Sequence, residues 1–264
     1  MQIISVINQK GGVGKTTTVI NLAAGLSLIE KKILVIDLDP QGNATTGLGL
    51  SNMESSSDTI YGVLNGTREI EEVIKKTQFE NLDIITSNVD LSGLEVETAD
   101  DSNRAFILKT KLTAYLNNSK GTYDYVLIDC PPSLSLLTVM ALVCSNSLLV
   151  PLQTEFFALE GLTQLMKTIE RIKSNLNPSL EIRGILLTMF DKRNKLSGQV
   201  EIEARNYFKE KVYSTAVPRN VRLSEAPSHG IPVLIYDKIC PGSKAYFEFT
   251  DEFLEQDKQV VSAA

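Results

Sequence analysis

The most constraining feature of this 264-residue chain is a glycine-rich string between a strand-like and a helix-like segment. The apolar run Ile3–Ile7 precedes the string, the periodic segment Thr17–Ile29 follows it, and the string itself reads Gln9-Lys10-Gly11-Gly12-Val13-Gly14-Lys15-Thr16-Thr17. Glycines allow a tight curl in which backbone N–H groups face inward, and the following helix adds the positive end of its dipole. The string therefore predicts a phosphate-binding loop that joins a buried strand to a helix.

Each polar residue at the end of this loop has an expected role. We expect Lys15 to reach the β- and γ-phosphates of a nucleotide, the Thr16 hydroxyl to complete a Mg²⁺ shell, and Thr17 to lie near the α-phosphate. The strict pattern GxxxxGK[ST] is not met, because its first glycine falls on Gln9. A lysine, Lys10, stands just ahead of the glycines instead.

The rest of the chain alternates strand-like and helix-like segments, which predicts an α/β fold with a doubly wound, mostly parallel sheet. Thr17–Ile29 and Leu159–Ile172 repeat apolar residues with the period of a helix. The strand candidates are short apolar runs that suit parallel strands covered on both faces: Ile3–Ile7, Ile33–Ile36, Leu82–Ile85, Tyr125–Ile128, Leu148–Leu152, Ile182–Met189, Val212–Val217 and Val233–Ile235.

The organisation of the chain favours one domain. We expect loops at Ser51–Thr59 and Thr98–Asn103, a single domain over residues 1–257 and a loose tail over residues 258–264. No apolar run reaches 18 residues and no signal peptide is recognisable, so we expect no membrane span. The three cysteines form no CxxC pair, which argues against a zinc site or a metal cluster and favours a reducing cytoplasm.

Three aspartates follow two of the predicted strands. Asp37 and Asp39 end the segment that starts at Ile33, and Asp129 ends the segment that starts at Tyr125. Ligands bind at the carboxyl ends of parallel strands. An apolar strand that ends in aspartate is typical of a Walker B motif, so we expect Asp129 to hold Mg²⁺ through water.

These motifs together resemble the deviant Walker A superfamily of P-loop NTPases. The loop matches its pattern KGGxGKT[ST], and residues 37–43 match the DxDPQGN switch of ParA/Soj proteins. The resemblance implies binding and Mg²⁺-dependent hydrolysis of ATP. It also implies that Asp39 positions the attacking water, that Asp37 supports the metal, and that Lys10 reaches across a dimer interface to the partner's nucleotide.

The C-terminal half carries the resemblance from the superfamily to Soj-type chromosome-partitioning ATPases. Residues 156–161, 184–191 and 218–230 all resemble that family, and the last segment matches over thirteen consecutive residues. By this resemblance the end of the strand at Met189 and the turn at Pro218 and Arg219 flank the adenine ring.

The charge distribution bears on a nucleic-acid partner. The chain has a net charge of −6, yet residues 183–222 hold nine basic and four acidic residues. Taken alone, such a run is more often a solvated face. The family resemblance instead implies that Arg193 and Arg222 line the face of an ATP-dependent homodimer that binds non-specific double-stranded DNA. It further implies a ParB-type partner that stimulates hydrolysis, and association with the nucleoid.

Other functions of the same loop remain open alternatives. A metabolic enzyme that uses the same loop, such as a nitrogenase-reductase-like or cluster-carrier protein, is disfavoured by the missing cysteine pair. A MinD-like membrane-positioning regulator is disfavoured because the apolar stripe Tyr246, Phe249 and Phe253 is flanked by acidic residues, and we expect that stripe to pack on the domain. A ParA-like ATPase that positions another cargo is not distinguished by the sequence. We interpret His229 as a loop residue and Cys130 as a small buried filler.

Overall fold

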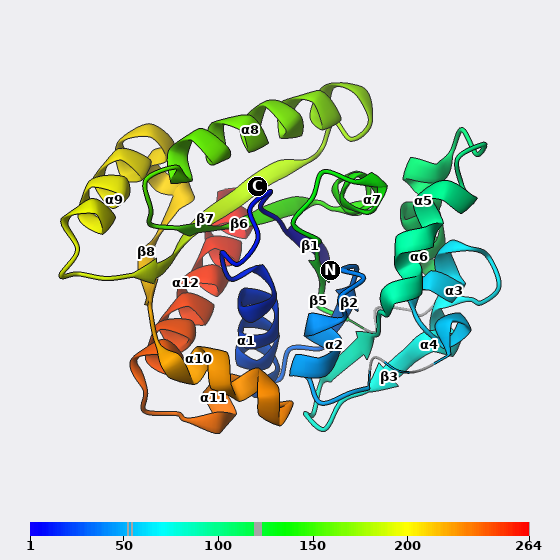
Figure 1. The fold of residues 1–264 in the computed structure, drawn as a ribbon, viewed down its shortest axis with the longest axis horizontal. Coiled ribbons are helices and arrows are strands. Elements are labelled where there is room, and N and C mark those ends of the chain that lie inside the picture. Colours follow the sequence, from blue (N-terminus) through cyan, green and yellow to red (C-terminus); the bar gives the residue numbers. More distant parts are fainter. Residues whose placement is uncertain (52, 54, 119–122, 264) are drawn as a thin grey trace.

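The structure is a computed structural model that describes residues 1–51, 53, 55–118 and 123–263. Its centre is one eight-stranded sheet with the order β3-β4-β2-β5-β1-β6-β7-β8 (Figure 1). Every neighbouring pair is parallel except β3 and β4, which are antiparallel. The strands are β1 (Gln2–Val6), β2 (Ile33–Asp37), β3 (Ile74–Lys76), β4 (Leu82–Ile85), β5 (Tyr125–Asp129), β6 (Ser147–Gln153), β7 (Glu181–Phe190) and β8 (Val212–Pro218).

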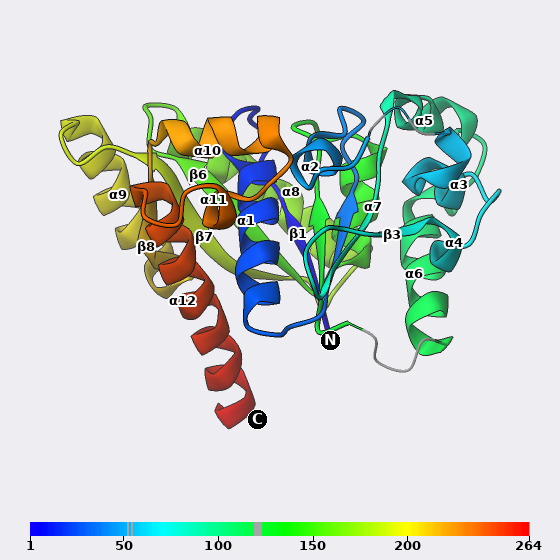
Figure 2. The same cartoon turned by 90° about the horizontal axis from the view of Figure 1, so that it is seen from below.

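Helices cover both faces of the sheet, as the doubly wound prediction requires. One face packs against α1 and α12, and the other packs against α6, α7, α8 and α9 (Figures 1 and 2). The helices are α1 (Lys15–Leu28), α2 (Asn43–Gly47), α3 (Ile60–Leu64), α4 (Ile70–Val73), α5 (Leu94–Glu97), α6 (Ile107–Asn118), α7 (Leu136–Cys144), α8 (Ala158–Asn175), α9 (Lys195–Phe208), α10 (Val221–Glu225), α11 (Val233–Tyr236) and α12 (Pro241–Ala263).

The central strands are apolar because they are buried from both sides. Every residue of β2 and β5 is buried, so neither face of these strands can carry the polar alternation of a half-exposed sheet. Seven of the eight predicted strands are confirmed, with ends that differ by at most one residue. The two predicted helices are also confirmed, although Ile29 follows the end of α1 and is exposed.

The prediction of a strand at Val233–Ile235 is wrong, because these residues begin the short helix α11. Pro232 precedes the helix, and the Asn21 side chain of α1 accepts a hydrogen bond from the Val233 N–H at 2.8 Å. A three-residue apolar run does not distinguish a strand from a buried turn of helix. The short antiparallel strand β3 is not predicted either, since two of its three residues are lysines.

The loops and the tail complete the comparison with the sequence. Residues 98–103 form turns, and residues 56–58 of the other predicted loop form a 3₁₀ helix, while residues 52 and 54 lie outside the described residues. Helix α12 buries Tyr246, Phe249 and Phe253 against the sheet, as expected. Its backbone is helical to Ala263, and the domain boundary at residue 257 stays a prediction. No helix within the described residues is long and apolar enough to cross a membrane.

Candidate nucleotide-binding site

The three predicted motifs meet at one edge of the sheet, where the parallel strands end. Strand β5 lies between β1 and β2, and its last residue, Asp129, is in register with Val6 on one side and Asp37 on the other. The glycine-rich loop follows β1 directly and leads into α1. Figure 2 shows the start of α1 together with α2 and α10 along this edge. The topology thus gathers the loop and both carboxylates from distant parts of the sequence.

The loop has the backbone of an anion site. Gly12 and Gly14 adopt φ values of 73° and 93°, in the left-handed region that favours glycine. Gly14 precedes the first turn of α1, where no side chain caps the helix and no acidic residue lies. The first N–H groups of a helix have no partner within the helix, and they carry the positive end of its dipole. This end of α1 therefore favours a phosphate group.

Contacts from neighbouring strands fix the shape of the loop. The Thr188 hydroxyl, on β7, donates a hydrogen bond to the Val13 carbonyl at 2.8 Å. The Asn8 side chain donates to the Pro151 carbonyl at 2.8 Å and accepts from the Lys10 N–H at 3.0 Å. Both positioning residues are missed by the sequence analysis, because their partners lie far away in the chain or carry no motif. The loop is therefore held before a ligand arrives, which lowers the cost of ordering it.

Lys15 and Thr16 both lie at this edge of the sheet, in the first turn of α1. The Lys15 ammonium donates to the Lys10 carbonyl at 3.1 Å, and its side chain is buried. Burial lowers the pKa of Lys15, and the nearby charges of Asp129 and Asp39 oppose that shift. A buried cation with so few anionic partners would gain strongly from the negative charge of a phosphate.

Thr16 and Asp129 offer the donor set of a magnesium site. The Thr16 hydroxyl donates to Asp129 Oδ2 at 2.7 Å, whereas Asp129 Oδ1 is buried and has no hydrogen-bond partner among the described residues. Burial, followed by the charge of Asp37, raises the pKa of Asp129. The described residues hold no cluster of three or more His, Cys, Asp or Glu side chains that could bind a metal alone. These residues fit a Mg²⁺ ion that shares its shell with phosphate oxygens and water.

Asp37 and Asp39 have different surroundings although they are two residues apart. Asp37 is fully buried, and its Oδ2 accepts hydrogen bonds from the Thr45 N–H at 2.8 Å and the Thr45 hydroxyl at 2.7 Å. Burial raises the pKa of Asp37 to about 6. Asp39 is 7% exposed, and its Oδ1 accepts from the Gln41 N–H at 3.0 Å. Asp37 is thus committed to contacts within the protein, which leaves Asp39 as the carboxylate nearer to solvent.

Lys10 is held within its own chain in this structure. Its ammonium forms an ion pair with Glu155 just before α8, and its side chain is 51% exposed. Ion pairs that solvent reaches contribute little free energy, so the half-exposed Lys10 can exchange Glu155 for another anion. Its predicted role across a dimer interface stays a prediction.

A pocket of about 270 Å³ joins the loop to the predicted adenine-flanking residues. Met189 adopts φ 51°, which is unusual for a side chain of this size, and the N–H of Arg219 donates to the Phe190 carbonyl at 3.3 Å. The strand ends at Met189 and Pro218 therefore lie side by side. The lining consists of Gly14, Thr17, Thr188, Met189, Val217, Pro218, Arg219, Asn220, Leu223, Ser224, Pro227 and Tyr246.

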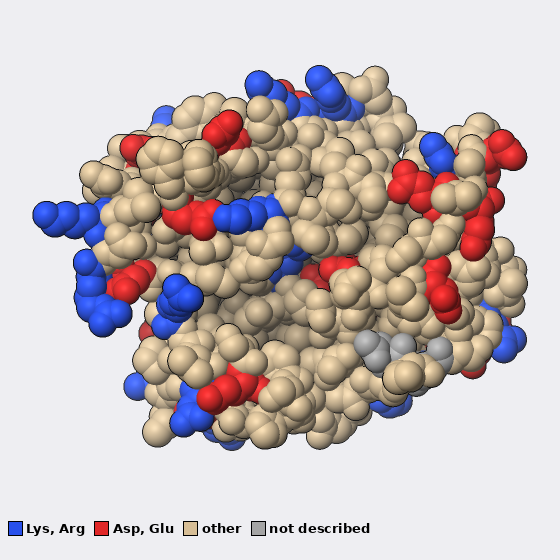
Figure 3. All heavy atoms as spheres, in the orientation of Figure 1, with Lys and Arg blue, Asp and Glu red and all other residues tan. Residues whose placement is uncertain are grey.

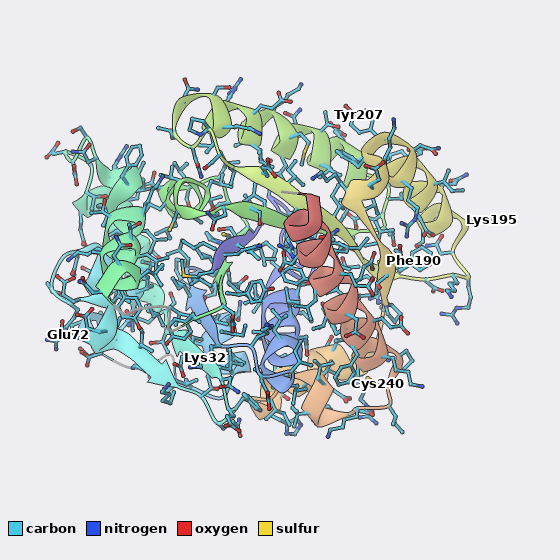
Figure 4. All side chains as sticks on the ribbon, turned by 180° about the vertical axis from the view of Figure 1, so that it is seen from behind. Lys32, Glu72, Phe190, Lys195, Tyr207 and Cys240 are labelled. Carbon is cyan, nitrogen blue, oxygen red and sulfur yellow. The ribbon has the colours of Figure 1, made fainter. Side chains whose placement is uncertain are left out.

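The two predicted DNA-binding arginines are exposed but paired. Arg193 makes two hydrogen bonds of 3.0 Å to Asp191 and is 91% exposed, and Arg222 pairs with Glu225 at 2.7 Å. Hydrogen bonds from the side chain and the backbone N–H of Arg193 lower the pKa of Asp191 to about 2. Basic side chains gather at the edge of the molecule that α9 and its preceding loop form (Figure 3), where Lys195 lies beyond the end of β7 at Phe190 (Figure 4).

Two reactive residue types near the site have ordinary roles. Cys130 is buried, and burial raises the pKa of its thiol, so it is the filler that the sequence predicts rather than a nucleophile. The ring of His229 stacks on Tyr236 with a centroid separation of 5.0 Å, as fits a surface loop residue.

Comparison with known proteins agrees with this geometry. Residues 1–182 match the family model described as an AAA domain. The chain is 50% identical to the chromosome partitioning protein ParA of Caulobacter vibrioides over 265 residues, which cover 100% of this chain and 98% of that protein. It is 48% identical to the chromosome-partitioning ATPase Soj of Treponema pallidum over 253 residues, covering 96% of this chain and 97% of that protein.

A solved structure extends the comparison to the fold and the site. The crystal structure of cobyrinic acid a,c-diamide synthase from Mycobacterium smegmatis, with a bound ATP analogue and magnesium, superposes with a TM-score of 0.83 at 32% identity. The match covers 98% of this chain and 96% of that one. With full-length relatives at about half identity and the nucleotide-binding edge described above, the chain belongs to the ParA/Soj family of chromosome-partitioning ATPases.

Proposed function

We propose that this chain is an ATP-driven switch that binds DNA only in its ATP state and so partitions chromosomal or plasmid DNA. One observation carries the proposal: a single pocket connects the phosphate loop at Gly14 and Thr17 to Met189, Pro218 and Arg219. This arrangement suits a purine nucleotide whose base lies between two strand ends and whose phosphates lie on the start of α1.

The residues of the site divide the work of hydrolysis. Mg²⁺, held by Thr16 and by Asp129 through water, would neutralise charge on the phosphate oxygens. Lys15 stabilises the charge that develops on the same oxygens, and the Asp39 carboxylate orients the attacking water. Phosphoryl transfer depends on positioning and charge compensation more than on a strong base, which these residues supply.

We further propose that ATP joins two protomers, with the Lys10 of each reaching the nucleotide of the other. In the ion pair between Lys10 and Glu155 of the same chain the lysine is half exposed, so solvent weakens the pair and a triphosphate in a partner could compete for the lysine. Dimerisation would place two basic edges on one particle. Two weak phosphate-binding faces that engage DNA together give an affinity that neither face has alone.

The net negative charge of the chain supports the proposal that DNA binding requires the basic edges of two protomers. A protomer with a net charge of −6 has little general attraction for nucleic acid. The exposed basic edge near Arg193 and Arg222 would contact the phosphate backbone without reading bases. A ParB-type partner would stimulate hydrolysis and release, and the protein would reside on the nucleoid within the cytoplasm.

The alternatives are less well supported by the arrangement of the chain. A membrane-positioning role would need an apolar face on α12, yet Phe249 and Phe253 of that helix are completely buried. The synthase name of the solved relative belongs to a protein at 32% identity, compared with 50% for the partitioning protein.

The double variant Arg193→Ala plus Arg222→Ala tests the DNA face. We expect ATP hydrolysis to persist, DNA affinity to fall at least about tenfold, and the salt dependence to become shallower by about two ions per protomer. The control Arg171→Ala plus Lys173→Ala removes the same charge from the exposed surface of α8 and should leave binding nearly unchanged. Full DNA affinity in the Arg193 and Arg222 variant would contradict the assignment.

A further inference from the structure

The Asp37 carboxylate braces the loop that carries Asp39. Its Oδ1 accepts the Asp39 N–H at 3.3 Å, while its Oδ2 accepts both the N–H and the hydroxyl of Thr45 at 2.8 and 2.7 Å. One buried carboxylate therefore binds both the start of the loop, at Asp39, and the helix α2 that follows the loop, at Thr45. Hydrogen bonds to an ionised acceptor are among the stronger ones in proteins, and more so away from water.

Thr45 connects this brace to the neighbouring strand β4. Its hydroxyl donates to Asp37 and also accepts the Ser87 N–H at 3.0 Å, just beyond the end of β4. The Thr45 side chain is 0% exposed, so water cannot replace either bond. A single hydroxyl thus ties α2 to the ends of β2 and β4.

Asp39 itself is positioned mostly by backbone contacts. The Leu38 N–H donates to the Asp129 carbonyl at 3.0 Å, and the Gly42 N–H donates to the Asp39 carbonyl at 2.9 Å. Within the described part of the chain, the only donor to the Asp39 carboxylate is the Gln41 N–H. The direction of this carboxylate is consequently set by the backbone conformation of residues 38–44. That conformation depends on the hydrogen bonds between Asp37, which precedes this segment, and Thr45, which follows it.

We infer that Thr45 is a positioning residue for ATP hydrolysis, acting through Asp37 to aim the Asp39 carboxylate at the attacking water. The inference rests on the proposed function and adds a residue to it. The Thr45 hydroxyl bonds to Asp37 and to the Ser87 N–H, and neither partner belongs to the phosphate loop or to the pocket beside it. Loss of its hydroxyl should therefore slow the chemical step without weakening nucleotide binding.

The test compares four purified chains: the natural protein, Thr45→Val, Thr45→Ser and Thr46→Val. The Thr46 hydroxyl lies one position further along α2, is exposed and bonds only to the Gly42 carbonyl at 3.1 Å, so Thr46→Val is a matched control. For each chain, kcat and KM for ATP and the equilibrium affinity for a fluorescent ATP analogue are measured. Hydrogen–deuterium exchange is followed over residues 38–45.

For Thr45→Val we expect kcat to fall roughly tenfold to hundredfold, since small misplacements of a catalytic group have effects of this size. The KM and the analogue affinity should stay within about threefold, which separates lost chemistry from lost binding. Exchange over residues 38–45 should become faster, Thr45→Ser should restore kcat, and Thr46→Val should behave as the natural chain.

Three results would overturn the inference. An unchanged kcat in Thr45→Val would show that the brace is not needed. A parallel loss of kcat and nucleotide affinity, with no rescue by Thr45→Ser, would show a merely structural role. A natural chain that does not hydrolyse ATP would overturn the proposed function, and the inference with it.

Discussion

At the scale of single residues, the candidate site is characterised by buried carboxylates. Asp37 and Asp129 are both 0% exposed and sit in register on adjacent strands, and the charge of Asp37 raises the pKa of Asp129 in addition to the effect of burial. Two buried carboxylates side by side lower the stability of the nucleotide-free chain, and a bound cation such as Mg²⁺ would compensate their charge. Function at this edge of the sheet therefore opposes stability, as is common at active sites.

The buried Asp37 gives a prediction about pH. Its pKa is about 6 in the folded chain against 3.8 as the ordinary value, so the folded chain keeps a proton that the unfolded chain has released. The contribution of Asp37 to the free energy of unfolding therefore falls as the pH rises from about 4 to about 6, by an amount on the order of 3 kcal/mol. Denaturant titrations of the natural chain and Asp37→Asn across this range measure the contribution.

The difference between the two chains is the quantity of interest, because other groups titrate in both. We expect Asp37→Asn to gain stability relative to the natural chain as the pH rises through this range. If the difference in unfolding free energy between the two chains stays constant with pH, burial does not raise the pKa of Asp37.

Sequence reasoning at this scale can place residues that belong to a motif of consecutive positions. The roles expected of Lys15, Thr16 and Asp129 depend on a short loop and a strand end, and the structure brings these residues together. Thr188 and Thr45 could not be found in the same way. Their partners are set by the order of strands in the sheet, with Thr188 meeting Val13 across 175 positions of sequence.

At the scale of elements, α12 determines how the C-terminal part of the chain is held. Phe249 is completely buried and packs edge-to-face against Tyr213 of β8 at 4.8 Å between ring centroids. Further along the helix, Asp257 pairs with Arg183 of β7 at 2.7 Å and accepts from Gln2 of β1 at 3.0 Å. The guanidinium of Arg183 also lies 3.8 Å from the Phe253 ring centroid. Apolar packing and a half-buried ion pair thus fasten one helix to three strands.

Removing the Phe249 ring should eliminate most of the apolar packing between α12 and the sheet. We expect Phe249→Ala to lower the free energy of unfolding by about 3–5 kcal/mol, the usual cost of deleting a buried aromatic side chain. Glu248→Ala, on the exposed side of the same helix turn, should change it by less than about 0.5 kcal/mol. Chemical denaturation monitored by circular dichroism measures both, and equal effects would contradict the packing of α12 on the sheet.

The strands and helices also show where the apolar pattern of the sequence is insufficient to predict secondary structure. Strands with continuous apolar runs, such as β5 and β7, follow from those runs. Two segments of three residues do not follow from their sequence, because the environment decides between strand and helix. The edge strand β3 pairs with β4 despite two lysines, and the apolar residues from Val233 form α11 because Asn21 and Pro232 fix its start.

At the scale of the whole molecule, charge is separated along the sheet. The edge beyond β8 carries exposed basic residues, whereas the far end around α5 exposes a series of carboxylates (Figure 3). The acidic group comprises Asp90, Glu95, Glu97, Asp100 and Asp101. The net charge of −6 thus hides a basic edge, and two such edges in a dimer would present DNA with a larger target.

The dimer itself is tested by mixing two inactive variants. Lys10→Ala lacks the lysine offered to a partner, and Asp39→Ala lacks the carboxylate that orients water. If Lys10 acts across the interface, each mixed dimer contains one complete site, and an equal mixture should recover about a quarter of the natural activity. Each variant alone at the same total concentration is the control. A mixture as inactive as its components would contradict a role for Lys10 in the partner's site.

The central claim is that ATP controls DNA binding, and one measurement tests it most directly. Binding of non-specific duplex DNA is measured at low salt with ATP, with ADP and without nucleotide, for the natural chain and for Asp39→Ala. The account predicts binding that requires ATP and that lasts longer in Asp39→Ala, because the variant holds ATP without hydrolysing it. Equal binding in all three nucleotide states, or no binding in any of them, would contradict it.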